Sequence, residues 1–69
     1  GLKMMILLDK SSGLAVNPAE VSSMRFESWN GDKHLVLTMQ TGKDLSVRHW
    51  PYGDGPNVYR LHEQLLEAK

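Results

Sequence analysis

The chain contains no cysteine, which excludes disulfide bonds and cysteine-ligated metal as sources of stability. It also lacks an excess of either charge, because eight lysines and arginines balance eight aspartates and glutamates. The usual electrostatic argument for binding nucleic acid or an anionic membrane is therefore missing. The longest apolar run, Met4–Leu8, is far below the ~20 residues of a membrane span and lacks the form of a signal peptide. We expect a soluble, cytoplasmic protein with no membrane partner.

The length of 69 residues allows one small domain, covering residues 1–69. Gly1–Lys3 precede two methionines that are both candidate starts, so these three residues are set aside as a candidate expression remnant. A domain near this size buries only ~60% of the surface of its unfolded chain. Without disulfides or metal, such chains often complete their core with another subunit, so a homo-oligomer is expected.

The first part of the chain predicts a hairpin followed by one helical turn. Met4–Leu8 and Leu14–Val16 are short apolar segments separated by a cluster of turn residues. Asn17–Glu20 begins with a capping asparagine and a proline at the first helical position. Two serines follow at once, so we expect a single turn, with Val21 anchoring it in the core.

The middle of the chain predicts a three-stranded meander. Asn30-Gly31 is the strongest hairpin dipeptide, and we expect Asp32-Lys33 to extend that loop and His34 to be a loop residue. A second glycine-containing turn lies at Thr41–Lys43. The predicted strands are Met24–Trp29, Leu35–Met39 and Asp44–Trp50.

The C-terminal segment predicts a helix over residues 56–68, because Val58, Leu61 and Leu65 recur at helical spacing. Asp54 or Gly55 would cap it. The fold class is therefore α+β, with a small antiparallel meander sheet of four to five strands packed by one C-terminal α-helix.

Strand alternation assigns the two faces of this sheet. The face toward the helix would carry the mainly apolar set Met24, Phe26, Leu35, Leu37, Met39, Leu45, Val47 and His49. The opposite, outer face would show Arg25, Glu27, Trp29, Val36, Thr38, Gln40, Ser46, Arg48 and Trp50.

The sequence predicts neither catalytic residues nor a cofactor. It has no Gly-x-Ser-x-Gly elbow and no phosphate-binding loop motif. A metal-dependent enzyme would have to use His49, Asp54 and His62, which lack the close ligand spacing of metal sites. We therefore expect no metal site, with His49 half-buried at the end of the sheet and His62 bordering the apolar stripe of the helix.

Four residues are the candidate binding site: Trp29, Arg48, Trp50 and Tyr52. Tryptophan, tyrosine and arginine are the residue types that anchor protein interfaces, including contacts between copies of one chain. Aromatic rings interleaved with arginines also stack single-stranded nucleic acid, but Glu27 shares this face and no basic stripe is present. A third interpretation is that the tryptophans only cap the edges of the core.

The irregular segment Trp50–Pro56 is the best candidate binding loop, because it is aromatic and joins a strand to a helix. The alternative is a plain connection in which Tyr52 packs on the sheet.

The overall pattern resembles the small FlbD-type flagellar proteins and similar short proteins of unknown role in bacteria and their phages. The resemblance spans about Met5 to Leu66 and lies in Ile6-Leu7-Leu8, Gly13, Val16-Asn17-Pro18, Val21, Leu35-Val36-Leu37, Gly42-Lys43, Leu45-Ser46-Val47 and the helix through Leu61 and Leu65. It implies a compact sheet with one helix and a non-enzymatic, protein-binding role, with no catalytic residues. The chain departs from the pattern in its longer Trp50–Pro56 loop and longer helix, which leaves a prophage or accessory bacterial role equally open.

The sequence thus predicts a non-enzymatic interaction module of a bacterium or phage that binds another protein or itself as a homo-oligomer. Weak binding of single-stranded nucleic acid by the outer sheet face is the alternative function.

Overall fold

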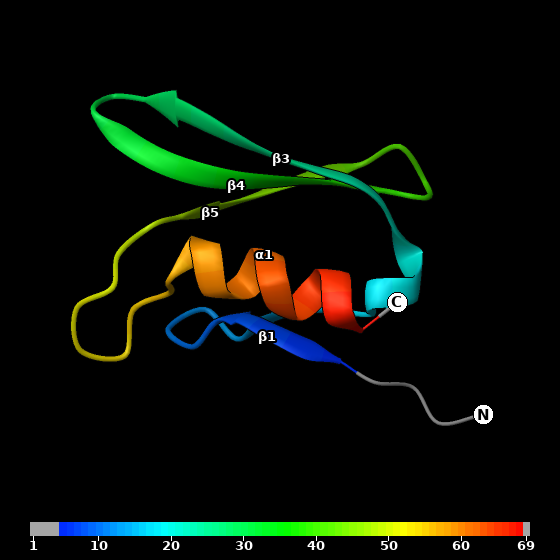
Figure 1. The fold of residues 1–69 in the computed structure, drawn as a ribbon, viewed down its shortest axis with the longest axis horizontal. Helices are drawn as coiled ribbons and strands as arrows, with labels where there is room; N and C mark the ends of the chain where they lie inside the picture. The colour runs from blue at the N-terminus through cyan, green and yellow to red at the C-terminus, as the bar shows by residue number, and fades with distance from the viewer. Residues whose placement is uncertain (1–4, 69) are drawn as a thin grey trace.

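A computed structural model of the chain describes residues 5–68 and confirms the α+β class (Figure 1). The five strands are all paired antiparallel, but they form two sheets, a hairpin and a three-stranded meander, where the sequence suggested a single sheet. In chain order, the elements are β1 (Ile6–Asp9), β2 (Leu14–Val16), the 3-10 turn η1 (Pro18–Glu20), β3 (Val21–Trp29), β4 (Asp32–Met39), β5 (Asp44–Arg48) and α1 (Val58–Glu67).

The β1–β2 hairpin and η1 form as the local signals predict. Ile6 pairs with Val16, and the side chain of Asn17 accepts a hydrogen bond from the Ala19 N–H at 3.0 Å. The turn satisfies backbone donors that would otherwise be unpaired, and it redirects the chain from the hairpin into the larger sheet. Val21 follows the turn and is buried, as expected, although it is already the first residue of β3. The prediction for Gly1–Lys3 lies outside the described residues.

The β3–β4 hairpin turns on two residues, Asn30 and Gly31, which both have positive φ, at 53° and 76°. These angles belong to the tight turn whose twist matches that of the strands it joins. Trp29 pairs directly with Asp32, so the strand resumes at once. The prediction that Asp32, Lys33 and His34 lie in a loop is therefore wrong, because the turn needs no further residue.

The last strand and the helix are shorter than predicted. Strand β5 ends at Arg48, and α1 begins at Val58, with Asn57 as its cap where Asp54 or Gly55 was expected. The Asn57 side chain accepts from the N–H groups of Tyr59 at 3.1 Å and Arg60 at 3.3 Å, which satisfies two helix-end donors. Within residues 5–68, no helix has the length and apolar character needed to cross a membrane.

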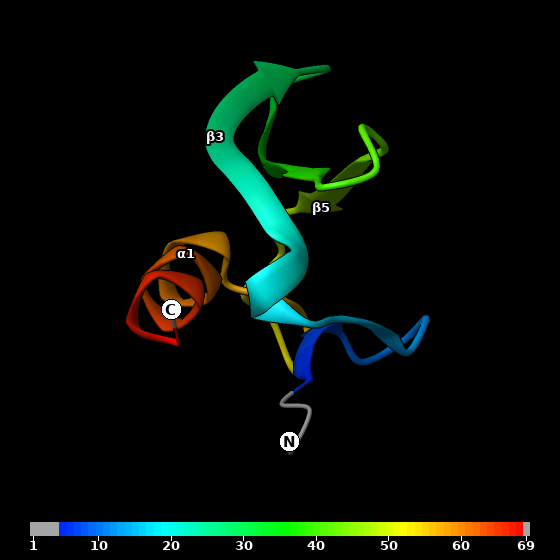
Figure 2. The same ribbon diagram turned by 90° about the vertical axis from the view of Figure 1, so that its right-hand side faces the viewer.

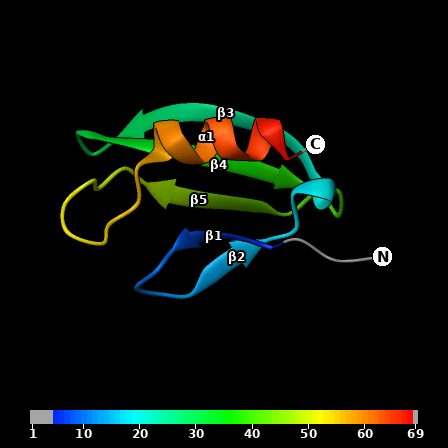
Figure 3. The same ribbon diagram turned by 60° about the horizontal axis from the view of Figure 1, so that its bottom comes forward.

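The core lies where the hairpin, the meander and α1 meet (Figure 3). Leu35, Leu37 and Leu65 are completely buried there. The apolar stripe of the helix faces the strands as its spacing predicts. The residues of this core cluster are Ile6, Leu8, Val16, Val21, Leu35, Leu37, Val47, Val58, Leu61 and Leu65, with Leu14, Met24, Met39 and Leu45 packed around it.

The meander is arched, and the hollow of the arch opens on the side away from α1 (Figure 2). This curvature alters exposure without altering the faces that alternation assigns. Val36 lies on the outer face as predicted, yet it is buried, because it sits in the hollow beside its strand neighbours Arg25 and Ser46. Phe26 lies on the face toward the helix, yet it is partly exposed, because it borders the outer edge of the sheet.

Because β1 contributes to the core, neighbouring leucines in it should respond very differently to truncation. Leu8 is 2% exposed and Leu7 is 50% exposed. Leu8→Ala should lower the free energy of unfolding by about 2–5 kcal/mol, since it removes buried methyl groups and leaves a cavity. Leu7→Ala is the matched control and should cost less than about 1 kcal/mol. Equal losses in chemical denaturation would show that the hairpin does not pack as described.

Candidate functional site

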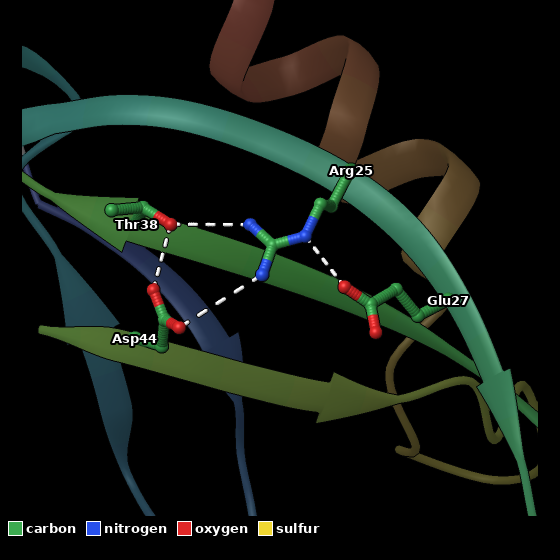
Figure 4. Close-up of polar contacts among 4 residues, drawn as sticks. All are labelled: Arg25, Glu27, Thr38 and Asp44. Carbon is green, nitrogen blue, oxygen red and sulfur yellow. Dashed lines mark hydrogen bonds and ion pairs between the residues drawn. The ribbon is translucent and has the colours of Figure 1, made fainter.

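A group of polar side chains on the outer face connects all three strands of the meander (Figure 4). Arg25 Nε donates to Glu27 Oε2 at 2.5 Å, and Arg25 Nη1 donates to Thr38 Oγ1 at 3.2 Å. Thr38 Oγ1 in turn donates to Asp44 Oδ1 at 2.7 Å, and Arg25 Nη2 lies 3.8 Å from Asp44 Oδ2. Two of the five guanidinium N–H donors of Arg25 therefore bind groups of the same chain, and Nη2 lies beside a carboxylate.

On the same face, Trp29 covers His34. The two rings are stacked with their centroids 3.5 Å apart and their planes 9° from parallel. His34 is only 7% exposed, and its Nε2 atom is buried with no hydrogen-bond partner among the described residues. Trp29 keeps one side of its indole open to solvent while the other rests on this imidazole.

Arg48 continues the row on β5. It lies opposite His34 in the β4–β5 pairing, and its guanidinium nitrogen Nη1 is 3.9 Å from Asp32 Oδ2. The guanidinium carbon also lies 4.2 Å from the centroid of the Trp50 ring. Trp50 meets Tyr52 edge to face at 5.0 Å and 74°. We call Trp29, His34, Arg48, Trp50 and Tyr52 the aromatic row.

The Trp50–Tyr52 end of the row opens into a cavity of about 430 Å³. This volume lies within the range of ~300–1,000 Å³ that is typical of small-ligand and side-chain pockets. Its rim carries charges of both signs, including an exposed ion pair between Lys10 Nζ and Asp54 Oδ2 at 3.6 Å. The lining residues are Asp9, Lys10, Ser11, Arg48, Trp50, Tyr52, Asp54, Gly55 and Pro56.

Backbone hydrogen bonds close the base of the loop that carries Trp50 and Tyr52. The Trp50 N–H donates to the Pro56 carbonyl at 2.8 Å, and the Gly55 N–H donates to the Tyr52 carbonyl at 2.9 Å. Gly55 is required by space, since a Cβ there would lie 1.8 Å from the Trp50 carbonyl oxygen. The aromatic side chains therefore project from a loop with a defined backbone.

His49 connects this loop to the helix. Its Nδ1 accepts a hydrogen bond from the Val58 N–H at 3.1 Å, so it satisfies one donor of the first helical turn. The predicted half-buried position of His49 is confirmed. His49 contacts Tyr59, His62 contacts Phe26, and Asp54 pairs with Lys10, so the three do not come together. Among residues 5–68, no group of three or more potential ligands is placed to hold a metal ion.

Asp9 lies on the rim of the cavity and accepts hydrogen bonds from the neighbouring serine. The Ser11 hydroxyl donates to Asp9 Oδ1 at 2.8 Å, and the Ser11 N–H donates to the same oxygen at 3.1 Å. These bonds favour the ionised carboxylate and hold the pKa of Asp9 below its ordinary value, with smaller contributions from Ser12. The carboxylate at this corner of the cavity is therefore stabilised in its charged form.

The structure brings Arg48, Trp50 and Tyr52 together, and it places Trp29 one residue further along the same row. Tyr52 packs on Trp50 and stays largely exposed, in contrast to the alternative in which it covers the sheet. Sequence reasoning missed His34 as the link between Trp29 and Arg48. The signal was present, because alternation counted back from Thr38 and Val36 places His34 on the outer face.

In comparisons with known proteins, no family model, curated protein or solved structure matches this chain. The resemblance to FlbD-type proteins stays a prediction.

Gly55→Ala should open the base of the loop, because the added methyl group collides with the Trp50 carbonyl. We expect a loss of about 1–3 kcal/mol in unfolding free energy. Hydrogen exchange at the Trp50 amide, which donates to Pro56, should become faster. Asp54→Ala is the control in the same loop, since it removes only an exposed ion pair. Unchanged Trp50 exchange in Gly55→Ala would contradict the described packing.

Ser11→Ala should raise the pKa of Asp9 toward its ordinary value, and Ser12→Ala should raise it less. A carboxyl pKa that is lowered by folding adds stability above its unfolded value of about 3.9. That contribution is lost as pH falls through the lower, folded value. NMR titration of the Asp9 carboxyl in the three proteins measures the order directly, and a larger effect of Ser12→Ala would reverse the assignment.

Proposed function

We propose that the chain is a non-enzymatic protein-interaction module that binds a segment of another protein at the Trp50–Tyr52 end of the aromatic row and also self-associates. The observation that carries this proposal is the exposed pair of rings on a closed loop beside a cavity. Groups that are already ordered lose little conformational freedom when a partner binds. Tryptophan, tyrosine and arginine in such a position are the types that dominate binding energy.

The charges around the row favour a protein over nucleic acid. Arg25 is paired with Glu27 and Asp44, and Arg48 lies beside Asp32. A phosphate backbone would have to displace these carboxylates or lie against them, and the net charge of zero supplies no general attraction. A polypeptide segment, with an apolar side chain for the cavity and groups of both charges for its rim, meets no such conflict.

The wider assignment is also part of the proposal: a cytoplasmic protein of a bacterium or phage, acting without a cofactor. It rests on the composition and on the resemblance to small FlbD-type proteins. Single-stranded nucleic acid remains the alternative ligand, favoured by the stacked, half-open indole of Trp29.

Peptides selected from a random display library on the wild-type protein should bind more weakly to two variants. Trp50→Ala and Tyr52→Ala should each lose at least about tenfold in affinity, as expected for an anchoring side chain. Tyr52 is 66% exposed, so its variant should melt within a few degrees of wild type. Leu7→Ala is the control, because Leu7 is 50% exposed and lies outside both the row and the lining of the cavity.

The same titrations with a single-stranded oligonucleotide test the alternative. Binding that weakens with added salt and is lost in Trp50→Ala would favour nucleic acid and count against the protein ligand. A fall in melting temperature that matches the loss of peptide affinity in Trp50→Ala would place Trp50 in the core and contradict the proposed site.

A further inference from the structure

Strand β3 is an edge strand of the meander, and among the described residues it pairs only with β4 (Figure 3). The direct pairing of Trp29 with Asp32 across the two-residue turn fixes which backbone groups face β4. From Ser23 to Trp29, odd-numbered residues of β3 point their N–H and C=O groups at β4, and even-numbered residues point theirs outward. The alternation on β4 agrees with this. Lys33, an odd-numbered residue, points its carbonyl away from β3, where it accepts a hydrogen bond from the His49 N–H at 2.8 Å. Met24, Phe26 and Ser28 therefore present open backbone groups.

An exposed apolar strip runs beside this open edge, on the face that α1 covers. Phe26 contacts Tyr59 at 5.2 Å and His62 at 4.9 Å between ring centroids. Leu66 follows Tyr59 and His62 at helical spacing and is 54% exposed, while Phe26 is 36% exposed. We call Phe26, Tyr59, His62 and Leu66 the edge strip. Open backbone groups next to exposed apolar side chains are the two components of a strand-pairing interface.

We propose that a second copy of this chain docks on the edge, with the two β3 strands antiparallel about a twofold axis that passes between the two Phe26 residues. This inference rests on the self-association part of the proposed function and adds its location and register. The pairing would join the meanders into one continuous six-stranded sheet. It would close the exposed edge by a symmetric contact, which ends at a dimer and does not propagate.

The charges on the outer face select this register. Only even-numbered residues offer open groups, so even-numbered residues must pair with even-numbered residues of the second copy. The twofold axis can therefore pass through the position of Phe26 or through that of another residue of the strand. Centring on Arg25 would place the two Arg25 cations opposite each other. Centring on Glu27 would place the two Glu27 carboxylates opposite each other, and both arrangements set like charges together. Centring on Phe26 sets Arg25 opposite Glu27 of the second copy, twice by symmetry. Within its own chain Glu27 binds Arg25 through Oε2, which leaves Oε1 for the second copy.

The helices fit the same arrangement. Both copies of α1 would lie on one face of the joined sheet, with the two edge strips meeting across the axis above the paired Phe26 rings. Tyr59 and Leu66 would then lose solvent exposure that the single chain leaves them. Trp50 and Tyr52 stand beyond β5, the opposite edge of the meander, so the dimer would present two separate copies of the cavity.

Ser28→Pro tests the edge with little effect on the single chain. Ser28 is exposed, and its outward N–H makes no hydrogen bond within the meander. Proline removes that donor and places its ring on the open edge, so the dimer dissociation constant should rise at least about tenfold in analytical ultracentrifugation. Ser28→Ala keeps the N–H and should stay within about threefold of wild type. Circular dichroism should show both variants folded.

Charge exchange tests the register. Arg25→Glu places carboxylates opposite Glu27 of the second copy, and Glu27→Arg places two cations opposite each other, so each should weaken the dimer about tenfold. The double variant Arg25→Glu/Glu27→Arg restores opposite charges in this register and should recover pairing. A double variant as weak as the single ones, while folded, would overturn the register.

The outcomes separate this inference from the site at Trp50. A wild-type chain that remains monomeric at millimolar concentration overturns the edge dimer and the self-association, while peptide binding at Trp50 is decided by its own titration. A dimer that survives Ser28→Pro but is lost in Trp50→Ala overturns the edge and moves self-association to the aromatic row. A monomer whose Met24, Phe26 and Ser28 amides shift only when an extended peptide is added gives the edge to a foreign strand and also overturns the proposal.

Discussion

The two-residue turn at Asn30-Gly31 is the constraint on which the rest of the molecule depends. It pairs Trp29 with Asp32, and that single pairing fixes the faces of β4 and of β3 from Ser23 to Trp29, up to the register shift that follows Val21. A shift of one residue would exchange the two faces and expose Leu35 and Leu37. The same turn decides which backbone groups of β3 face inward and which remain open. The core, the aromatic row and the free edge therefore follow from one local geometry that needs positive φ at two adjacent positions.

The loop after β5 joins the core to the candidate site. Trp50 is tied to Pro56 through the backbone, and the next residue, Asn57, caps the helix. His49 reaches across the same gap to the first turn of α1. The helix thus starts where the loop closes, and the residues that set its position also hold the exposed rings. A change that loosens the loop would disturb helix packing and the cavity together.

Most of the fold could be predicted because its signals are local. Asn17-Pro18 marks the helical turn, Asn30-Gly31 marks the hairpin, and alternation assigns the faces correctly. The failures arise where distant parts of the chain decide. Val36 is buried because the sheet is arched, and curvature is a property of the whole sheet that alternation does not contain. Asn57 caps the helix because loop closure between Trp50 and Pro56 places it there.

The candidate site was predicted in its residues but not in its connections. Trp29, Arg48, Trp50 and Tyr52 were singled out by residue type. His34, which stacks on Trp29 and lies opposite Arg48 in the strand pairing, was missed because the predicted loop was too long. A predicted loop that is three residues too long is a small error in length. Such an error nevertheless leaves residues such as His34 out of the predicted outer face, because only residues assigned to a strand are given a face by alternation.

Arg25 links the outer face of the meander to the open edge of β3. It ties β3 to Thr38 on β4 and to Asp44 on β5, across the hollow of the arch. Each exposed ion pair of this kind contributes only about 0–1 kcal/mol, so the group matters more for geometry than for stability. By holding Arg25 and Glu27 side by side, it gives the open edge a fixed pattern of alternating charge. An edge of nine residues without such a pattern would accept a strand in several registers, whereas this pattern distinguishes one of them.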